Sequence, residues 1–194
     1  MKVLSAEFVL SAAEAGQLPQ DRLPQVAFLG RSNVGKSSLI NALTKSRLAR
    51  TSAEPGKTRL LNAYRIHLSG GARFYLIDLP GFGFARGPTE GFDALMAGYW
   101  EARHQAATAT LCVFLVDARH PGLDADRATW AWLEREGFER VVVLTKVDKL
   151  SRAERTRHFR QFDTLFNVPR VAVSALGGEG LDDLWQMILK HLPR

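Results

Sequence analysis

The stretch that decides the fold is Gly30-Arg31-Ser32-Asn33-Val34-Gly35-Lys36-Ser37, which fits the pattern GxxxxGK[ST]. An apolar run, residues 26–29, precedes it, and a helical pattern, residues 37–43, follows it. In this setting the glycines let the backbone wrap closely around phosphate oxygens, and the N–H groups at the helix start face the negative charge. The stretch therefore predicts a phosphate-binding loop. Lys36 is expected to reach the β- and γ-phosphates of a nucleotide, and Ser37 to ligate Mg²⁺.

A second motif, Asp78-Leu79-Pro80-Gly81, ends the apolar run 74–77. At a strand end, Asp78 can hold Mg²⁺ through a water molecule, and the Gly81 amide can meet a γ-phosphate. The simpler alternative is an Asp-Pro-Gly turn that merely ends a strand. These motifs still leave ATPases, kinases and GTPases open, so the choice depends on a motif that reads the base.

Thr145-Lys146-Val147-Asp148 follows the apolar run 140–144 and offers such a motif. The Asp148 carboxylate can accept hydrogen bonds from guanine N1–H and N2–H₂, whereas adenine lacks both donors and would leave the acid unpaired. The Lys146 stem can cover the base plane. The alternative is that Asp148 is an exposed acidic loop residue, but its place in the motif order argues for guanine and against a kinase that uses ATP.

Two further observations bear on the base. Ser174-Ala175-Leu176 follows a weaker last strand, residues 170–173, and would offer a backbone N–H to guanine O6. Thr145 stands where most guanine-nucleotide switches have asparagine, so a side-chain amide is missing there. The four motifs each follow a separate expected strand, and this order makes independent coincidence very improbable.

The chain alternates short apolar runs with helical patterns, which predicts a mostly parallel sheet with helices on both faces. We expect a three-layer α/β fold for residues 25–194, with a six-stranded sheet that has one antiparallel edge strand, and an N-terminal extension for residues 1–24. A hairpin turn is expected at residues 69–71. The expected strands are residues 26–29, 63–68, 72–77, 111–116, 140–144 and 170–173, and the expected helices are residues 37–43, 90–104, 124–136, 151–166 and 180–192.

Composition narrows the class of protein. The 194 residues fit one domain, and 46% hydrophobic with 24% charged residues exclude a disordered chain. One cysteine and five scattered histidines argue against a disulfide framework or a zinc site. The net charge of +6 favours a polyanionic partner, the alternative being an ordinary basic protein. Since no stretch approaches about 20 apolar residues and the start lacks a signal-peptide pattern, we expect a cytoplasmic protein without a membrane partner.

Taken together, the motifs resemble the EngB family of bacterial GTPases, also called YihA or YsxC. The resemblance covers residues 26 to about 189 and rests on GRSNVGKSSLINAL (30–43), PGKTR (55–59), DLPGFGFA (78–85), LTKVDKL (144–150) and VSA (173–175). It implies a P-loop GTPase fold, GTP or GDP as ligand, Mg²⁺, and a role in assembly of the large ribosomal subunit. It also implies a need for the protein in normal cell division and septation.

The resemblance also assigns residues to roles. Thr58 becomes the second protein ligand of Mg²⁺ beside Ser37, with Asp78 acting through water; without the family it would be a polar loop residue. Lys36, Thr58 and Gly81 are the expected catalytic residues. The expected nucleotide contacts are Gly30, Arg31, Ser32, Asn33, Val34, Gly35, Lys36, Ser37, Ser38, Gly56, Lys57, Thr58, Asp78, Leu79, Pro80, Gly81, Thr145, Lys146, Asp148, Ser174, Ala175 and Leu176.

Two positions bear on the rate of hydrolysis. Many GTPases carry a water-orienting glutamine directly after Asp-x-x-Gly, but here that residue is Phe82, so slow intrinsic hydrolysis is expected. Asn33 leaves two alternatives open. Either it helps to hold a K⁺ ion that offsets charge between the phosphates, as in related GTPases, or it merely shapes the loop.

The expected partners are the large ribosomal subunit or its precursor and ribosomal RNA, with the protein itself a monomer. Arginines and lysines near the two expected switch segments are candidates for RNA contacts, the alternative being solvated loops. They are Arg47, Arg50, Lys57, Arg59 and Arg86. A second function class also stays open, namely a non-hydrolysing RNA-binding assembly protein that uses GTP as a structural ligand.

Overall fold

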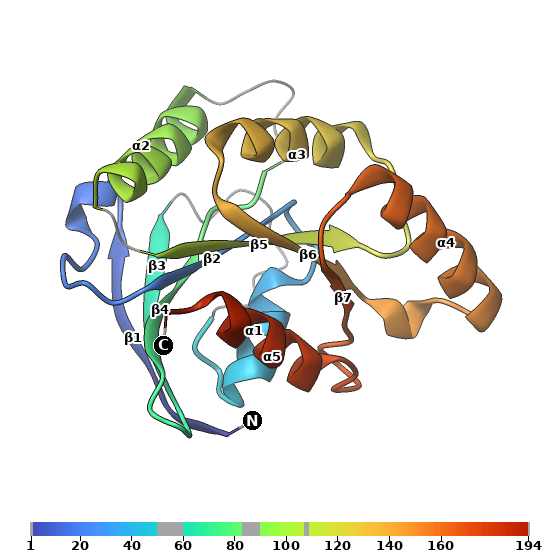
Figure 1. Cartoon of the computed structure of the whole chain (residues 1–194), viewed down its shortest axis with the longest axis horizontal. Helices are drawn as coiled ribbons and strands as arrows, with labels where there is room; N and C mark the ends of the chain where they lie inside the picture. Colours follow the sequence, from blue (N-terminus) through green and yellow to red (C-terminus); the bar gives the residue numbers. More distant parts are fainter. Residues whose placement is uncertain (1, 50–59, 83–89, 107–108, 194) are drawn as a thin grey trace.

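The computed structural model describes residues 2–49, 60–82, 90–106 and 109–193 (Figure 1). In this part of the chain the strands are β1 (Val3–Ala12), β2 (Gln25–Gly30), β3 (Leu61–Leu68), β4 (Arg73–Asp78), β5 (Thr110–Asp117), β6 (Glu139–Thr145) and β7 (Arg170–Ala172). The α-helices are α1 (Lys36–Thr44), α2 (Glu90–Ala106), α3 (Asp124–Glu136), α4 (Arg152–Leu165) and α5 (Leu181–His191). Two short 3₁₀ helices are η1 (Ala15–Gln17) and η2 (Val147–Lys149).

The strands form one sheet in the order β1-β3-β4-β2-β5-β6-β7. The strands β4, β2, β5, β6 and β7, which are neighbours in that order, are bonded in parallel. The strand β3 is antiparallel to both of its neighbours, β1 and β4. The α/β class and the mostly parallel sheet are confirmed. The sheet differs from the expectation in two respects, because it has seven strands in the described residues and its antiparallel strand lies one place in from the edge.

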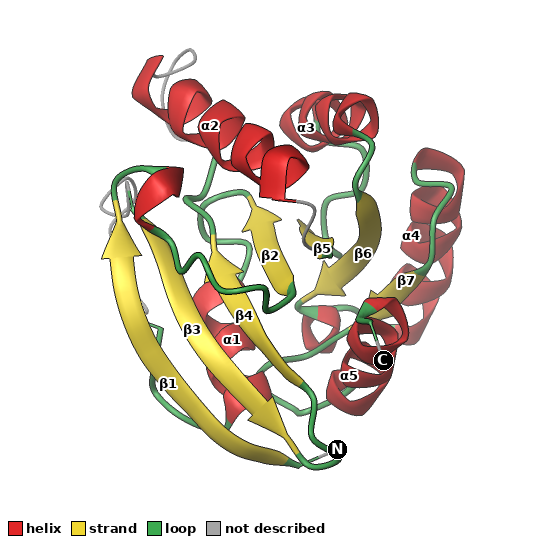
Figure 2. Cartoon of the chain, turned by 60° about the vertical axis from the view of Figure 1, so that its left-hand side comes forward, coloured by secondary structure: helices red, strands yellow, loops and turns green. Residues whose placement is uncertain are grey.

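The additional strand is β1, which pairs with β3 from Val3 opposite Leu68 to Ala12 opposite Leu61 and forms the sheet edge in Figure 2. Its register shifts twice, between Val3 and Ser5 and between Phe8 and Leu10. Each such irregularity breaks the alternation of inward and outward side chains that marks a strand in a sequence. This is the physical reason why sequence pattern did not reveal β1.

Two hydrophobic cores lie on opposite faces of the sheet. The helices α2, α3 and α4 cover one face, and α1 and α5 cover the other (Figures 1 and 2). All eight residues of β5 are buried, with Phe114 in the first core and Val113 in the second. Burial on both faces explains why the central strands read as continuous apolar runs.

The helix α4 begins as its sequence predicts. Ser151 and Glu154 form a reciprocal capping box, and Phe162 is buried in the core. Arg155, four residues before the half-buried Phe159, is itself half-buried. It donates to the Val147 carbonyl over 3.1 Å and pairs with Glu179 in a bidentate manner, so its charge is held by protein groups at the sheet edge.

The turn before α5 requires glycine at one position. Gly180 has φ +73°, and a Cβ added there would lie 2.0 Å from the carbonyl oxygen of Ala172. Gly178 has a similar φ of +76°, but a Cβ there would meet no atom within 4 Å. The two glycines thus share the same backbone strain and differ in the space around them.

We expect Gly180→Ala to lower the free energy of unfolding by about 3 kcal/mol or more, because left-handed strain adds to a collision with backbone. Gly178→Ala is the matched control and is expected to cost about 1 kcal/mol. Urea unfolding of both variants measures the difference. Equal losses would show that the close approach to Ala172 does not constrain this turn.

Candidate functional site

The candidate site is the edge of the sheet where five parallel strands end. Because β2, β4, β5, β6 and β7 run in the same direction, their carboxyl ends lie along one edge, where ligands bind in open α/β sheets. The predicted motifs follow four of these strand ends. The phosphate loop follows β2, Asp78 ends β4, the 145–148 motif begins at the end of β6, and Ser174 follows β7.

The predicted phosphate loop joins β2 to α1 as expected. Gly35 has φ +102° and precedes the helix, whose first residue is Lys36. A Cβ on Gly30 would lie 2.9 Å from both the Leu115 carbonyl oxygen and Val34 Cγ1, so the chain leaves no room for a side chain there. The loop therefore places the unpaired N–H groups of the α1 N-terminus at this edge, where they favour an anion.

Lys36 and Asp78 form a largely buried ion pair between the phosphate loop and the end of β4. The Lys36 ammonium donates directly to one Asp78 carboxylate oxygen. Gly81 lies against the loop, since a Cβ on it would come within 2.9 Å of Ser32 Oγ and 3.1 Å of Ser32 Cα. The Asp-x-x-Gly motif and the phosphate loop are thus in direct contact.

The 145–148 motif also contacts the phosphate loop, through hydrogen bonds to two of its backbone carbonyls. The Thr145 hydroxyl lies 2.7 Å from the Val34 carbonyl oxygen and 3.1 Å from that of Val116. The Lys146 ammonium donates to the Asn33 carbonyl over 2.5 Å. A threonine hydroxyl therefore makes a direct link to the phosphate loop at the position where an asparagine amide was missing from the sequence.

Asp117, at the end of β5, is a site residue that the sequence analysis missed. Its carboxylate pairs with the Lys146 ammonium at 3.0 Å and accepts from Arg119 Nε at 2.9 Å and Nη2 at 2.7 Å. Burial raises the pKa of Asp117, but the hydrogen bonds from Arg119 and Lys146 outweigh it and bring that pKa to about 2. The available signal was an acidic residue directly after the apolar run 111–116, the same position that singled out Asp78.

Asp148 is held by Ser174 across two strand ends. The Ser174 hydroxyl donates to Asp148 Oδ1 over 2.7 Å and accepts from the Gly177 N–H over 2.9 Å. The hydrogen bond from Ser174 is the main cause that lowers the pKa of Asp148. The carboxylate is therefore an ionised, oriented and partly exposed acceptor, as a base-reading residue requires.

The segment after β7 is expected to offer a backbone N–H to guanine O6, and the first of its three N–H groups already has a partner. The Ser174 N–H donates to the Glu179 carbonyl over 3.0 Å, so this amide is engaged within its own loop. Ala175 is half-buried and Leu176 is 84% exposed. Of the three predicted residues, Ser174 contributes its side chain by fixing Asp148.

Phe82 belongs to the core. Its ring stacks on Phe114 with centroids 6.2 Å apart and an interplanar angle of 7°. Its backbone pairs with Arg31, and the Ser32 N–H donates to the Phe82 carbonyl over 2.9 Å. The residue after Asp-x-x-Gly thus fixes the segment to the sheet and brings no polar side chain to the site.

Several predicted residues lie outside the described ranges. They are Gly56, Lys57 and Thr58 of the expected nucleotide and metal set, and Arg50, Arg59 and Arg86 of the expected RNA contacts. Arg47 is described and is exposed.

The described residues contain no group of three or more histidine, cysteine or acidic side chains that could hold a metal. The donors that fit Mg²⁺ are the Ser37 hydroxyl and the Asp78 carboxylate, both hard oxygen ligands.

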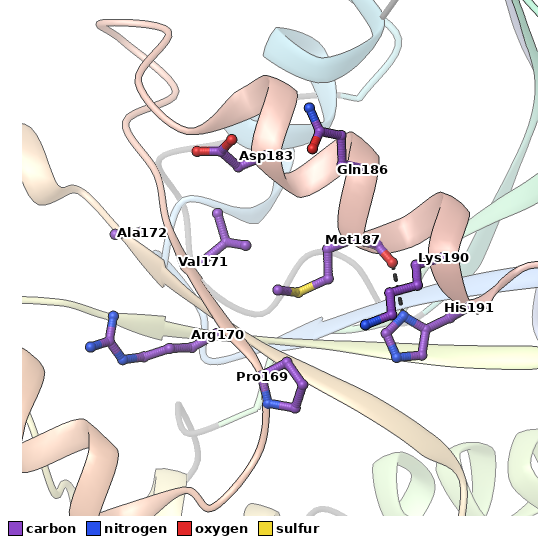
Figure 3. Close-up of a pocket in the computed structure, with 9 residues that line it drawn as sticks. All are labelled: Pro169, Arg170, Val171, Ala172, Asp183, Gln186, Met187, Lys190 and His191. Carbon is purple, nitrogen blue, oxygen red and sulfur yellow. Dashed lines mark hydrogen bonds between the residues drawn. The ribbon is translucent and has the colours of Figure 1, made fainter.

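Among residues 2–49, 60–82, 90–106 and 109–193, no helix is long and apolar enough to cross a bilayer. A hollow of about 590 Å³ lies between β7 and α5 (Figure 3), and its lining residues include none of the predicted site residues.

Comparison with known proteins gives a consistent result. Residues 25–146 match a family model described as a 50S ribosome-binding GTPase, and residues 99–194 match the GTP-binding domain of elongation factor Tu. A probable GTP-binding protein EngB from Solibacter usitatus is 43% identical over 99% of this chain and 98% of its own length. One from Chlorobaculum parvum is 41% identical over 97% of both chains.

Solved structures agree on the fold. Era of Aquifex aeolicus bound to GDP·AlF4⁻ superposes with a TM-score of 0.75 at 23% identity, over 89% of this chain and 58% of the Era chain. The crystal structure of a probable GTP-binding protein EngB superposes with a TM-score of 0.64 at 25% identity, over 86% and 97% of the two chains. Because its EngB relatives are 43% and 41% identical to it over nearly their full length, the chain belongs to the EngB family of GTP-binding proteins and is a P-loop GTPase.

Proposed function

We propose that this GTPase binds GTP and GDP with Mg²⁺ at the strand-end edge and hydrolyses GTP slowly, as a switch in assembly of the large ribosomal subunit. The contact that carries the proposal is the one between Asp148 and Ser174, which orients an ionised acceptor at the same edge as the phosphate loop. Residues 25–194 form the GTP-binding domain in this proposal. Residues 1–24 are an N-terminal extension, of which residues 3–12 add a strand to the sheet.

The phosphates are held by the loop after β2. The N–H groups at the start of α1 meet phosphate oxygens, and the Lys36 ammonium exchanges its Asp78 partner for the β- and γ-phosphates. Ser37, Thr58 and Asp78, the last through water, would hold Mg²⁺, which adds positive charge next to the phosphates when bound. Gly81, which already touches Ser32, offers its amide to the γ-phosphate.

The guanine is read by Asp148, with the Lys146 stem over its plane. Two donors of guanine face the carboxylate, so a base without those donors leaves Asp148 desolvated and unpaired. The hydrogen bond from Ser174 keeps one carboxylate oxygen in place, which reduces the conformational freedom lost on binding.

Slow hydrolysis follows from the position of Phe82. Its ring is packed on Phe114 and carries neither a donor nor an acceptor, so it cannot orient an attacking water. The role of K⁺ stays a prediction. Asn33 is exposed and has φ +62°. Lys146 donates to the backbone carbonyl of Asn33 and not to its side-chain amide.

Assembly of the large ribosomal subunit is the proposed biological role, together with a need for the protein in normal cell division and septation. The matched family model is described as a 50S ribosome-binding GTPase, and a net charge of +6 suits a ribosomal RNA partner. We place this role in the cytoplasm and assign it to a monomer. The second candidate is an RNA-binding assembly protein that keeps GTP as a structural ligand, and the core position of Phe82 is the observation that favours it.

Guanine selectivity tests the base assignment. We expect Asp148→Asn to weaken GTP binding by about a hundredfold, because two charge-assisted hydrogen bonds are lost. Binding of xanthosine triphosphate should improve relative to GTP, since its C2 oxygen can accept from the new amide. Titration of both nucleotides by calorimetry measures the change. If the variant binds GTP as tightly as the parent, Asp148 does not read the base.

The Thr145 link to the phosphate loop is testable in the same assay. We expect Thr145→Val to weaken GDP and GTP binding by about tenfold, because the Val34 carbonyl loses its hydroxyl donor. Thr145→Ser keeps the hydroxyl and should bind as the parent does. The link would be unimportant for binding if the valine and serine variants gave the same dissociation constant.

Multiple-turnover phosphate release with and without large ribosomal subunits separates the two candidate functions. A switch releases phosphate slowly alone and faster with particles, whereas a structural GTP gives no turnover in either case.

Binding to the particles should weaken steeply with salt, by a slope near −0.7 per phosphate contact on single strands. We expect Arg47→Glu and Arg50→Glu to weaken the complex with GTP affinity unchanged. An affinity independent of salt would contradict the electrostatic account.

A further inference from the structure

A buried carboxylate on α3 lies against the phosphate loop, although neither α3 nor its residues belong to the site described above. Asp126 is in the first turn of α3, and its side chain is 3% exposed. Arg31 Nε lies 3.2 Å from Asp126 Oδ1, and Arg31 is the first residue of the phosphate loop after Gly30. The pair therefore connects the phosphate loop to α3, the helix that follows β5 in the chain.

The contact is close but not well aligned. Within the described residues neither Asp126 oxygen nor Arg31 Nε makes a hydrogen bond of good geometry. A buried carboxylate without hydrogen bonds is costly unless a charge compensates it, and Arg31 is the cation that faces it. Arg31 thus supplies the counter-charge that the buried Asp126 carboxylate requires.

The backbone of Arg31 transmits this position to the second motif. Arg31 pairs with Phe82 as a parallel bridge, and the next residue, Ser32, donates its N–H to the Phe82 carbonyl. Ser32 also lies against Gly81, which leaves no room for a Cβ. A displacement of Arg31 therefore moves both the phosphate loop and the segment that follows Asp-x-x-Gly.

We propose that Asp126 is a positioning residue for nucleotide binding, which acts through Arg31 to fix the start of the phosphate loop and the Gly81–Phe82 segment. The inference rests on the proposed role of residues 30–37 in phosphate binding. Backbone N–H groups bind phosphate well only when they are aligned before the ligand arrives. Loss of the charge on Asp126 releases Arg31 and loosens that alignment.

The charged groups around Asp126 make the device sensitive to pH. Burial raises the pKa of Asp126 to about 6; Arg31 from the loop opposes this shift, and Asp117 from the end of β5 adds to it. Because this pKa is raised in the folded state, the carboxylate becomes neutral as the pH falls through about 6. His158 of α4, which bonds the Ala118 carbonyl next to Asp117, is the other nearby group to control for.

The experiment measures the dissociation rate of a fluorescent GDP analogue from the full chain between pH 5 and pH 8. For the parent we expect dissociation about fivefold faster at pH 5 than at pH 7.5. Asp126→Asn should be fast at every pH, and Asp126→Glu should restore part of the pH dependence. Asp124→Asn, an exposed acid in the same helical turn, is the matched control and should behave as the parent. His158→Gln should keep the pH dependence.

A double-mutant cycle tests the pairing itself. Arg31→Gln should also speed dissociation, and Arg31→Gln with Asp126→Asn should be no faster than the worse single variant, because the second change removes a charge already without its partner. This double variant also keeps the test available if Arg31→Gln alone fails to fold. Additive effects, slower dissociation in Asp126→Asn, or a parent and Asp126→Asn with the same rates would overturn the inference. If the parent does not bind the analogue at all, the proposed function fails instead.

Discussion

Two hydrogen bonds tie the end of β6 to the phosphate loop, one from the Thr145 hydroxyl to the Val34 carbonyl and one from the Lys146 ammonium to the Asn33 carbonyl. The two residues of the first bond are 111 positions apart in the chain, and those of the second are 113 positions apart. Both bonds therefore form only when the parallel sheet is correctly assembled. In the proposed function the two ends of one nucleotide meet these two segments. A ligand that contacts both gains from their alignment, which the fold has already established.

At this edge one cation, Lys146, serves two acceptors, and one carboxylate, Asp117, has two cationic partners. Lys146 contacts both the Asn33 carbonyl and the Asp117 carboxylate, and Asp117 is shared with Arg119. A buried carboxylate with two cationic donors stays ionised, which agrees with its lowered pKa. Asp126 is the contrasting case, since it faces one imperfectly aligned cation and its pKa is raised to about 6. Two acids near the same loop thus differ in charge state through their partners.

Sequence pattern predicted the elements whose residues must satisfy a regular period or a fixed turn. The central strands and the helix α3 over Asp124–Glu136 have the positions that their patterns indicate. The strand β1 was missed because two register shifts interrupt its alternation. The Arg31–Asp126 contact could not be predicted for a different reason. Nothing in a single sequence says which acid of the α3 first turn points inward, and the exposed Asp124 differs from Asp126 only in its position around the helix.

The place of Phe82 joins the fold to the proposed chemistry. A polar residue after Asp-x-x-Gly could reach a water at the site, but the ring here fills a position in the core against Phe114. The same segment is bonded to Ser32, so it is held as part of the sheet edge. In the proposed function the chain therefore binds phosphates with preorganised backbone groups, and this position contributes nothing to water activation. The proposed switch therefore requires another group, from a partner or from an ion, to complete its transition state, and that requirement is what lets a partner control its state.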